Sequence, residues 1–252
     1  PSFADIFHRV TMRIAVISDI HGNLEAFEQV LADMDESSVD ASVCLGDSIG
    51  YGPDPEKVVQ ILRKHCIPSV MGNHELAIAR PEHLGWFNPS ARRSLLITRE
   101  LISEGTLDYI SLLPASLVIE GALFVHGCPP DSMTRYLLDF SERQLAGLFR
   151  RMEQDICFVG HTHTLEIVTF DGSRAIRSPL RQGTHSLREG FRYIVNVGSV
   201  GQPRDGNNRA KYVLWDNVEN RLETRFVPYD ARITAAKILE LGFPGINATR
   251  LL

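Results

Sequence analysis

The sequence predicts an α/β fold in which two sheets pack face to face and helices cover their outer faces. In the first half of the chain, short apolar runs alternate with segments of helical spacing, which is typical of parallel strands joined by crossover helices. In the second half, apolar runs follow one another with short connections, which indicates antiparallel strands. The sequence contains no linker, repeat or low-complexity segment, so we predict a single domain over residues 12–252.

Five segments have the apolar spacing and the end signals of helices. They are residues 23–34, a helix that begins at Pro55, residues 89–103, residues 141–152 and residues 231–241. Asn23, Asn88 and Ser141 can cap the free N–H groups of a first turn, and Gln144 completes a capping box with Ser141. Gly242 marks the end of the last helix.

The predicted strands are apolar runs of three to six residues bounded by polar or glycine-containing segments. In the first half they are residues 14–17, 43–45, 67–71, 123–125 and 156–159, and in the second half residues 165–170, 192–197, 211–215 and 222–227. Asp171-Gly172 follows the first of the later runs and is a strong hairpin signal.

Composition and charge argue against several classes of protein. The chain is 44% apolar and 23% charged, and its net charge of −5 without a long basic run disfavours a nucleic-acid partner. No run approaches the roughly 18 apolar residues of a membrane span. Residues 1–11 lack the features of a signal peptide, and we expect a short leader or a remnant of protein production there. Four cysteines without a C-x-x-C pair suit reduced thiols in a cytoplasmic protein.

Five short polar blocks carry the functional signal, because each directly follows one of the apolar runs. They are Ser18–Asn23, Gly46-Asp47, Gly72–Glu75, His126-Gly127 and Gly160–His163. Open α/β folds place their binding sites beyond the strand ends, so we expect these blocks to meet at one edge. A lone His or Asp in a loop is more often a cap or a solvated side chain, but five such blocks together predict a metal site.

The number of candidate ligands points to two ions. On an extended chain the side chains of Asp19 and His21 point the same way, and His161 and His163 repeat that spacing. Asp47, Asn73 and His126 come from separate strand ends, which makes seven candidates. Seven exceeds the needs of one tetrahedral site, whereas two ions that share a carboxylate would use them all.

The blocks resemble the signature of the calcineurin-like metallophosphoesterases, and the resemblance covers nearly the whole chain from Met12. Residues 46–55 and 196–205 resemble the small bacterial and archaeal branch with YfcE-type phosphodiesterases and diadenosine-tetraphosphatase-like proteins. The resemblance implies a four-layer α/β/β/α sandwich of two mixed sheets flanked by helices. It implies that one metal is held by Asp19, His21 and His163, a second by Asn73, His126 and His161, and that Asp47 bridges both.

The ligands are nitrogen and oxygen donors, so we expect two divalent transition-metal ions, with manganese first and iron, zinc, cobalt or nickel as alternatives. The hypothesis is a phosphodiesterase that hydrolyses a small or nucleotide-like phosphodiester through a metal-bridging hydroxide. By resemblance, His74 lies over the metals, where it could protonate the leaving oxygen or stabilise the transition state. The alternative for His74 is a role in orienting its neighbours.

The substrate is less well determined than the reaction. Arg204, Arg92 and Arg93 are candidates for phosphate contacts, although surface ion pairing is the commoner role for any one such arginine. Tyr51 could stack on a base or cover the edge of the core, and Cys128 suits a packing role. A phosphomonoesterase, a diadenosine-tetraphosphate-type hydrolase and a non-catalytic scaffold remain alternatives. We expect a small phosphate ester as partner and no membrane, and the sequence is compatible with a homo-oligomer.

Overall fold

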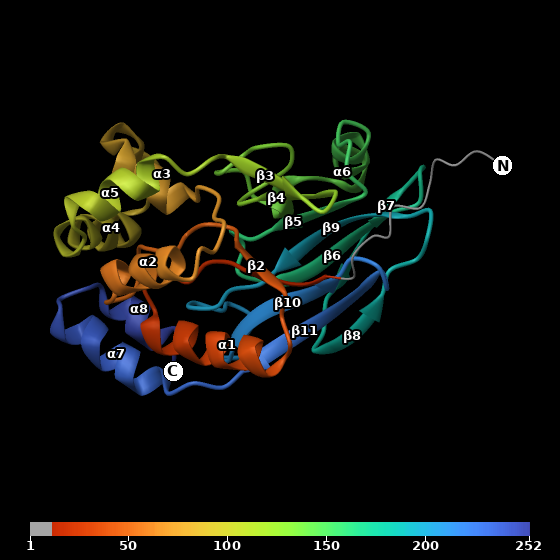
Figure 1. The fold of residues 1–252 in the computed structure, drawn as a ribbon. Coiled ribbons are helices and arrows are strands. Elements are labelled where there is room, and N and C mark those ends of the chain that lie inside the picture. The colour runs from red at the N-terminus through yellow and green to blue at the C-terminus, as the bar shows by residue number, and fades with distance from the viewer. Residues whose placement is uncertain (1–11) are drawn as a thin grey trace.

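Two β-sheets lie face to face at the centre of the structure, a computed structural model that describes residues 12–252 (Figure 1). The prediction for residues 1–11 lies outside the described residues. The five-stranded sheet has the order β2 (Ala41–Cys44), β1 (Arg13–Ile17), β10 (Ala210–Asp216), β11 (Arg221–Val227) and β8 (Gly183–Ser186). The six-stranded sheet has the order β3 (Ser116–Ile119), β4 (Ala122–Val125), β5 (Ile156–Val159), β9 (Arg192–Val197), β6 (Leu165–Phe170) and β7 (Ala175–Pro179).

Both sheets are mixed, which confirms the predicted fold class. Parallel pairs join β1 to β2, β4 to β5 and β5 to β9, while the remaining ladders are antiparallel. The parallel and antiparallel halves of the sequence do not correspond to the two sheets. Instead, β10 from the second half pairs with β1, and β9 pairs with β5. Each sheet is therefore assembled from both halves of the chain.

The side chains of the central strands alternate between two apolar layers. In β1, Ile14 and Val16 face the space between the sheets, whereas Ala15 and Ile17 face the outer helices. In β5, Ile156 and Phe158 face the same central layer, whereas Cys157 and Val159 face the apolar layer on the outer side of the six-stranded sheet. A strand buried on both faces needs no polar alternation, which explains its continuous apolar run.

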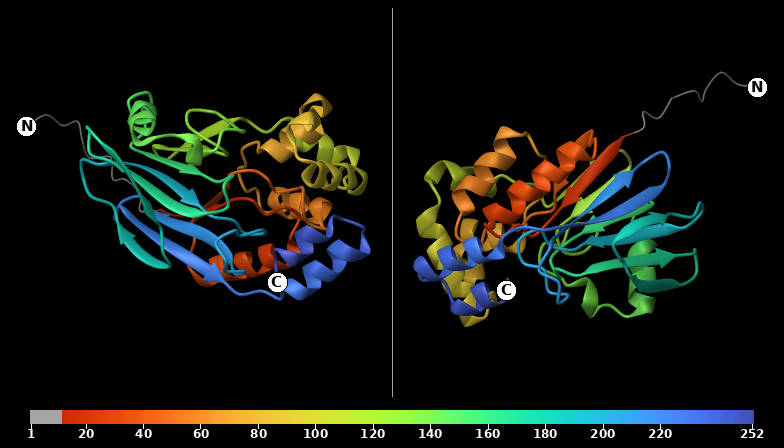
Figure 2. Two further views of the ribbon diagram at one scale, coloured as in Figure 1. Left: turned by 180° about the vertical axis from the view of Figure 1, so that it is seen from behind. Right: turned by 90° about the horizontal axis from the view of Figure 1, so that it is seen from below.

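Helices cover the outer face of each sheet, which completes the four layers (Figure 2). On the five-stranded sheet, α1 (Leu24–Glu36) packs against β10 and β11, and α7 (Ala231–Glu240) packs on α1 and on α8 (Gly245–Thr249). On the other sheet, α6 (Glu142–Phe149) contributes to the outer apolar layer. Asn23 caps α1, and Ser141 and Gln144 form the capping box of α6, as predicted.

A group of helices extends beyond one end of the sandwich. It contains α2 (Pro55–Lys64), α3 (Asn73–Ala79), the 3₁₀ turn η1 (Pro81–Trp86), α4 (Pro89–Leu101) and α5 (Glu104–Ser111). The helix predicted over residues 89–103 is shorter, because the Ser103 side chain accepts a hydrogen bond from the Thr106 N–H group and so caps a new helix. The helix predicted to reach Met152 ends at Phe149, and a turn at residues 150–151 follows it before the chain enters β5.

One predicted strand is wrong, and several elements were not predicted. Residues 67–71 make only a single parallel bridge, between Ser69 and Cys44, and lead directly into α3. The strands β3, β7 and β8, the helices α3, α5 and α8, and the turn η2 (Leu137–Asp139) lack the long periodic patterns that sequence reasoning needs. Within residues 12–252, no helix is both long enough and apolar enough to cross a bilayer.

Candidate metal centre

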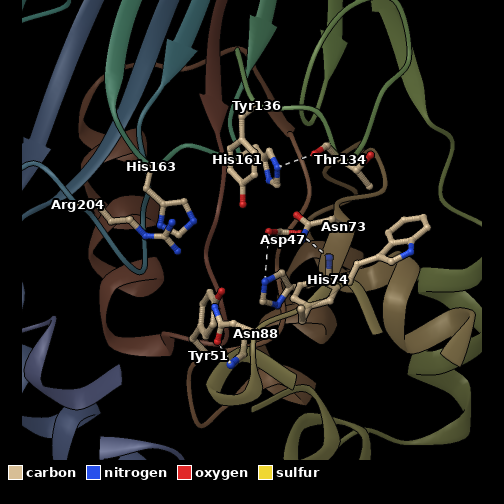
Figure 3. Close-up of a pocket in the computed structure, with 13 residues that line it drawn as sticks. Asp47, Tyr51, Asn73, His74, Asn88, Thr134, Tyr136, His161, His163 and Arg204 are labelled. Atoms are coloured by element: carbon tan, nitrogen blue, oxygen red, sulfur yellow. Dashed lines mark hydrogen bonds and ion pairs between the residues drawn. The ribbon is translucent and has the colours of Figure 1, made fainter. Parts of the chain in front are cut away.

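The seven candidate ligands converge at the end of the sandwich that faces the extra helices. They come from the loops after β1, β2, β4 and β5 and from the start of α3, and Figure 3 shows several of them around one pocket. Six are buried and Asn73 is partly buried: Asp19, His21, Asp47, Asn73, His126, His161 and His163. The structure thus brings the seven candidate ligands together.

Backbone conformation explains how the loops aim these side chains. Five of the seven have a left-handed backbone, with φ of 53° at Asp19, 51° at His21, 49° at Asp47, 68° at His161 and 61° at His163. The expected extended spacing of Asp19 with His21 and of His161 with His163 is therefore wrong. Residues other than glycine rarely adopt this conformation, which costs about 1–3 kcal/mol and is concentrated at functional sites.

Close backbone packing holds the loops in these conformations. The N–H groups of Asp19 and His21 donate to the carbonyl oxygens of Gly46 and Asp47, at 3.1 and 2.8 Å. Gly46 itself has φ of 89°, and a Cβ there would lie 2.5 Å from the backbone nitrogen of Gly72. Only glycine fits at this crossing, so the loop after β2 can lie against the start of α3.

The first cluster consists of Asp19, His21 and His163. The Nε2 atoms of the two histidines are 3.1 Å apart, and Asp19 Oδ1 is 3.3 Å from His163 Nε2 and 3.7 Å from His21 Nε2. These three residues form a candidate metal-ligand group whose donor atoms all lie within 4.8 Å of one another.

The second cluster consists of Asp47, His126 and His161, with Asn73 beside it. His126 Nε2 lies 3.4 Å from Asp47 Oδ2, 3.1 Å from His161 Nδ1 and 3.1 Å from Asn73 Oδ1. Asp47 Oδ2 is also 3.8 Å from His21 Nε2, so this carboxylate lies between the two clusters. Asp47 is in addition 3.8 Å from His74 and forms a third group with His21 and His74.

Backbone carbonyl groups orient the four histidine rings. Nδ1 faces the Ile49 oxygen in His21, the Leu45 oxygen in His126 and the Gln202 oxygen in His163, at 3.0, 2.8 and 2.5 Å. In His161 it is Nε2 that faces a carbonyl, that of Thr134, at 3.2 Å. A carbonyl oxygen can only accept, so these ring nitrogens carry protons, and the opposite nitrogens point into the clusters. Metal-binding histidines have this arrangement.

The donor set fits divalent cations on three observations. Burial lowers the pKa of His21 well below its usual value, which favours a neutral ring. Its Nε2 atom faces His163 Nε2, and a cation between the two nitrogens would bind both. Asp19 Oδ1 is buried without a hydrogen-bond partner among the described residues. Burial would raise the pKa of Asp47, but His126 and His74 hold it well below the usual value, so this buried carboxylate stays charged. Within residues 12–252 no Lys or Arg pairs with either aspartate.

The second cluster attracts positive charge for the same reason. Burial alone would lower the pKa of His126, but the nearby Asp47 carboxylate raises it to about 9. By contrast, burial and the neighbouring His126 lower the pKa of His161 to about 3. A proton on His126 or a cation between the rings would neutralise Asp47.

His74 lies beside the clusters and contributes to the pocket wall. Its ring contacts Tyr51 and Phe87, with centroid distances of 4.6 and 5.1 Å, and His21 at 4.7 Å. Burial lowers the pKa of His74 to about 4, so the imidazole is neutral near pH 7 and one ring nitrogen is a donor. A Cβ at Gly50 would lie 2.1 Å from His74 Nδ1, so glycine is required under this ring.

Glu75 is a buried residue to which sequence reasoning gave no role. Its carboxylate accepts hydrogen bonds from the backbone N–H groups of Asp47, Ser48, Ile49 and Gly72, and from the Ser48 hydroxyl, at 2.7–3.3 Å. It therefore fastens the loop that carries Asp47 to the first turn of α3. Its position three residues after Gly72, where a capping-box acid stands, is the signal that could have identified it.

Four of the seven candidate ligands line an open cavity of about 170 Å³: Asp47, Asn73, His161 and His163. Its walls include Tyr51 and Arg204, which the sequence had selected, and Trp86, Thr134 and Tyr136, which it had not. The Tyr136 ring stacks on His161 with a centroid distance of 3.9 Å and an interplanar angle of 19°, and Figure 3 shows its hydroxyl directed into the cavity.

The remaining candidates have other places in the structure. Arg92 and Arg93 are exposed on α4 and do not line the cavity. Cys128 is buried in the apolar layer under α6, which agrees with the packing role expected for it.

The chain matches the calcineurin-like phosphoesterase superfamily domain over residues 12–220. It is also similar to an uncharacterized protein of Methanocaldococcus jannaschii, with 35% identity over 250 residues that cover 96% of this chain and 98% of the relative.

Solved structures show the same architecture. A metallophosphoesterase from Sphaerobacter thermophilus has a TM-score of 0.82 and 36% identity, over 95% of this chain and 98% of that one. A hypothetical protein from Pyrococcus horikoshii has a TM-score of 0.76 and 20% identity, over 95% and 97% of the two chains, and shares the fold.

Proposed function

The chain belongs to the calcineurin-like phosphoesterase superfamily, and we propose that it is a metal-dependent phosphodiesterase acting on a small, nucleotide-like diester. The observation that carries this proposal is the placement of Asp47, which lines an open cavity, between two clusters of histidine and oxygen donors. Two ions that share one carboxylate are the arrangement expected for in-line displacement at phosphorus.

Each donor has a place in the proposed centre. Asp19, His21 and His163 would hold one ion, Asn73, His126 and His161 the other, and Asp47 would contact both. When bound, the two cations would neutralise phosphoryl oxygens and make a water molecule more acidic. The donors are nitrogen and oxygen atoms without a thiolate, so manganese is proposed first, with iron, cobalt, nickel and zinc as alternatives.

His74 would act on the leaving group. It lines the cavity beside the donors without belonging to the seven, and its buried imidazole is neutral. The N–H group of a neutral imidazole can donate a hydrogen bond to the departing oxygen, whose negative charge grows in the transition state. The Asp47 carboxylate, 3.8 Å from His74 Nε2, orients the ring.

A second candidate is a dinucleoside-polyphosphate hydrolase with the same centre. It is favoured by Arg204, which lines the cavity and also a neighbouring groove that contains Arg209 and Arg250. None of the three arginines forms an ion pair with another described residue. Guanidinium groups without a carboxylate partner suit a substrate with several phosphates.

A substrate panel with manganese-loaded protein tests the proposal. It contains a chromogenic phosphodiester, the corresponding monoester, cyclic nucleotides and diadenosine tetraphosphate, and Asp47→Asn protein is the control. We expect turnover of the diester that depends on added metal and is lost in the control. Preference for diadenosine tetraphosphate would select the second candidate. Folded protein without turnover under any divalent transition metal would contradict both and favour a scaffold role.

A further inference from the structure

One of the residues that line the cavity, Trp86, has a large aromatic side chain that is not buried in the core. Trp86 is 63% exposed and lies in η1, yet it lines the same cavity as Asp47, His74 and His163. The other tryptophan, Trp215, is 4% exposed in the layer between the sheets. An indole left in water at the rim of a site forgoes the stabilisation that burial would provide, and aromatic side chains commonly line ligand pockets.

Local contacts hold the Trp86 ring in place. The imidazole of His83 lies against it, with a centroid distance of 4.1 Å and an interplanar angle of 35°. The next residue, Phe87, packs against the helical cluster and meets the His74 ring edge-on at 5.1 Å. The His83 ring therefore packs against the indole, and the neighbouring residue Phe87 contacts His74 beside the candidate metal ligands. A ring held in place loses little conformational freedom on binding, which favours affinity.

Other residues that line the cavity have a different chemistry. Arg204 presents a guanidinium group, 6.0 Å from the centroid of the Tyr51 ring, and the Tyr136 hydroxyl points inward. The cavity therefore combines the candidate metal ligands with the Arg204 guanidinium group, which can bind an anion, and with the exposed aromatic surface of Trp86. A ligand that matches it combines a phosphate with a planar aromatic group.

We propose that Trp86 is a stacking platform for a nucleobase carried by the substrate, so that the enzyme acts on nucleotide esters rather than on other small phosphate esters. This inference rests on the proposed function and narrows its substrate class. Stacking tolerates every base because each has a π-face, so the platform selects nucleotides without selecting one base.

The test uses two substrates with the same scissile group. The methyl ester of AMP and the methyl ester of ribose 5-phosphate differ only in the base, so the leaving groups have the same chemistry. We expect wild-type protein to favour the AMP ester in kcat/KM, chiefly through KM. In Trp86→Ala the ratio of the two kcat/KM values should fall by about 5- to 150-fold, the range of stacking on an aromatic side chain. Trp86→Phe should keep part of the preference.

A matched control removes an exposed apolar side chain elsewhere. Ile176, in β7, is 50% exposed and does not line the cavity. Ile176→Ala should keep the wild-type ratio. If Trp86→Ala lowers kcat/KM equally for both esters, or leaves their ratio unchanged, the proposal is wrong. A shift of oligomeric state in Trp86→Ala with equal losses for both esters would assign the indole to contact with a second copy instead, and would also overturn it.

Fluorescence gives a readout that does not depend on turnover. The chain has two tryptophans, so the emission of the exposed indole can be separated from that of the buried one. AMP should quench wild-type emission and ribose 5-phosphate should not, and Trp86→Phe should abolish the difference while Trp215→Phe keeps it. Quenching by AMP without turnover of either ester would support the platform and contradict the proposed hydrolysis. Turnover without any base-dependent quenching or preference would support hydrolysis and contradict the platform.

Discussion

The Nε2 atoms of His21 and His163 lie 3.1 Å apart, although the two residues are separated by 142 positions in the chain. Each ring is held by a carbonyl oxygen at its other nitrogen, and the Asp19 carboxylate lies within 3.7 Å of both Nε2 atoms. The fold thus places three metal-ligand atoms, His21 Nε2, His163 Nε2 and Asp19 Oδ1, close together, although their lone pairs repel one another.

Metal binding should therefore stabilise the fold. We expect Mn²⁺ to raise the thermal midpoint of chelator-treated protein, because a cation relieves this repulsion in the folded state only. At a metal concentration about 100 times Kd the gain is about 2.7 kcal/mol. Differential scanning fluorimetry measures it, and Asp19→Asn protein should show a much smaller shift. Equal shifts in both proteins would contradict the assignment of Asp19.

Replacement of His74 should slow turnover without removing metal. We expect His74→Ala to lower kcat by about 10²- to 10⁴-fold, since it removes the donor proposed for the leaving oxygen. Elemental analysis should still find two ions per chain. The exposed His65, outside the polar blocks, provides the control His65→Ala. Near-full turnover of a two-metal His74→Ala protein would show that His74 only orients its neighbours.

Loss of the Glu75 carboxylate should weaken both the fold and the metal site. Glu75→Ala leaves five hydrogen-bond donors unsatisfied, and we expect a loss of at least about 3 kcal/mol in the free energy of unfolding. Metal affinity should fall by about 10- to 100-fold, as for other residues that orient ligands. Denaturant titration and calorimetry measure these effects. Glu104→Gln, at an exposed ion pair, should change stability by less than about 0.5 kcal/mol.

The four cysteines should differ in reactivity. Cys66 is exposed, whereas burial raises the pKa of the Cys44 and Cys128 thiols to about 12 and that of Cys157 well above its usual value. Mass spectrometry after alkylation of native protein should find one modified thiol, at Cys66, and four after unfolding. Early alkylation of a second cysteine under native conditions would show that the apolar layers open.

The pair of Asp33 and Arg225 should make stability depend on pH. Burial would raise the pKa of Asp33, but bidentate hydrogen bonds from Arg225, at 2.6 and 3.0 Å, and one from Tyr212 lower it below the usual value. The folded state therefore binds the proton less tightly than the unfolded state. The stabilisation is complete above the ordinary carboxyl pKa and is lost as pH falls through the lowered one.

Asp33→Asn tests this sign. The difference in unfolding free energy between wild type and variant should be largest near neutral pH and should shrink as the pH is lowered below about 4. Urea titrations at several pH values measure it. A difference that stays constant down to acid pH would mean that the carboxylate is not stabilised by its partners.

The sequence by itself determined which residues make up the candidate metal centre and much of the outline of the fold. The polar blocks identified the seven candidate ligands and His74, and local signals such as the N-cap Asn23 and the capping box at Ser141 placed helices correctly. These features depend on neighbouring residues, so they can be read from a linear pattern.

Only the tertiary structure decided how the parts meet. The left-handed turns at Asp19 and His161, the clamp formed by Glu75, and the approach of Arg204 and Trp86 to one cavity all depend on contacts between distant segments. A residue of low intrinsic preference for such a conformation adopts it because packing around it leaves no alternative. The pattern of apolar side chains in the sequence indicates which face of a helix or strand is buried, but it does not indicate which other element packs against that face.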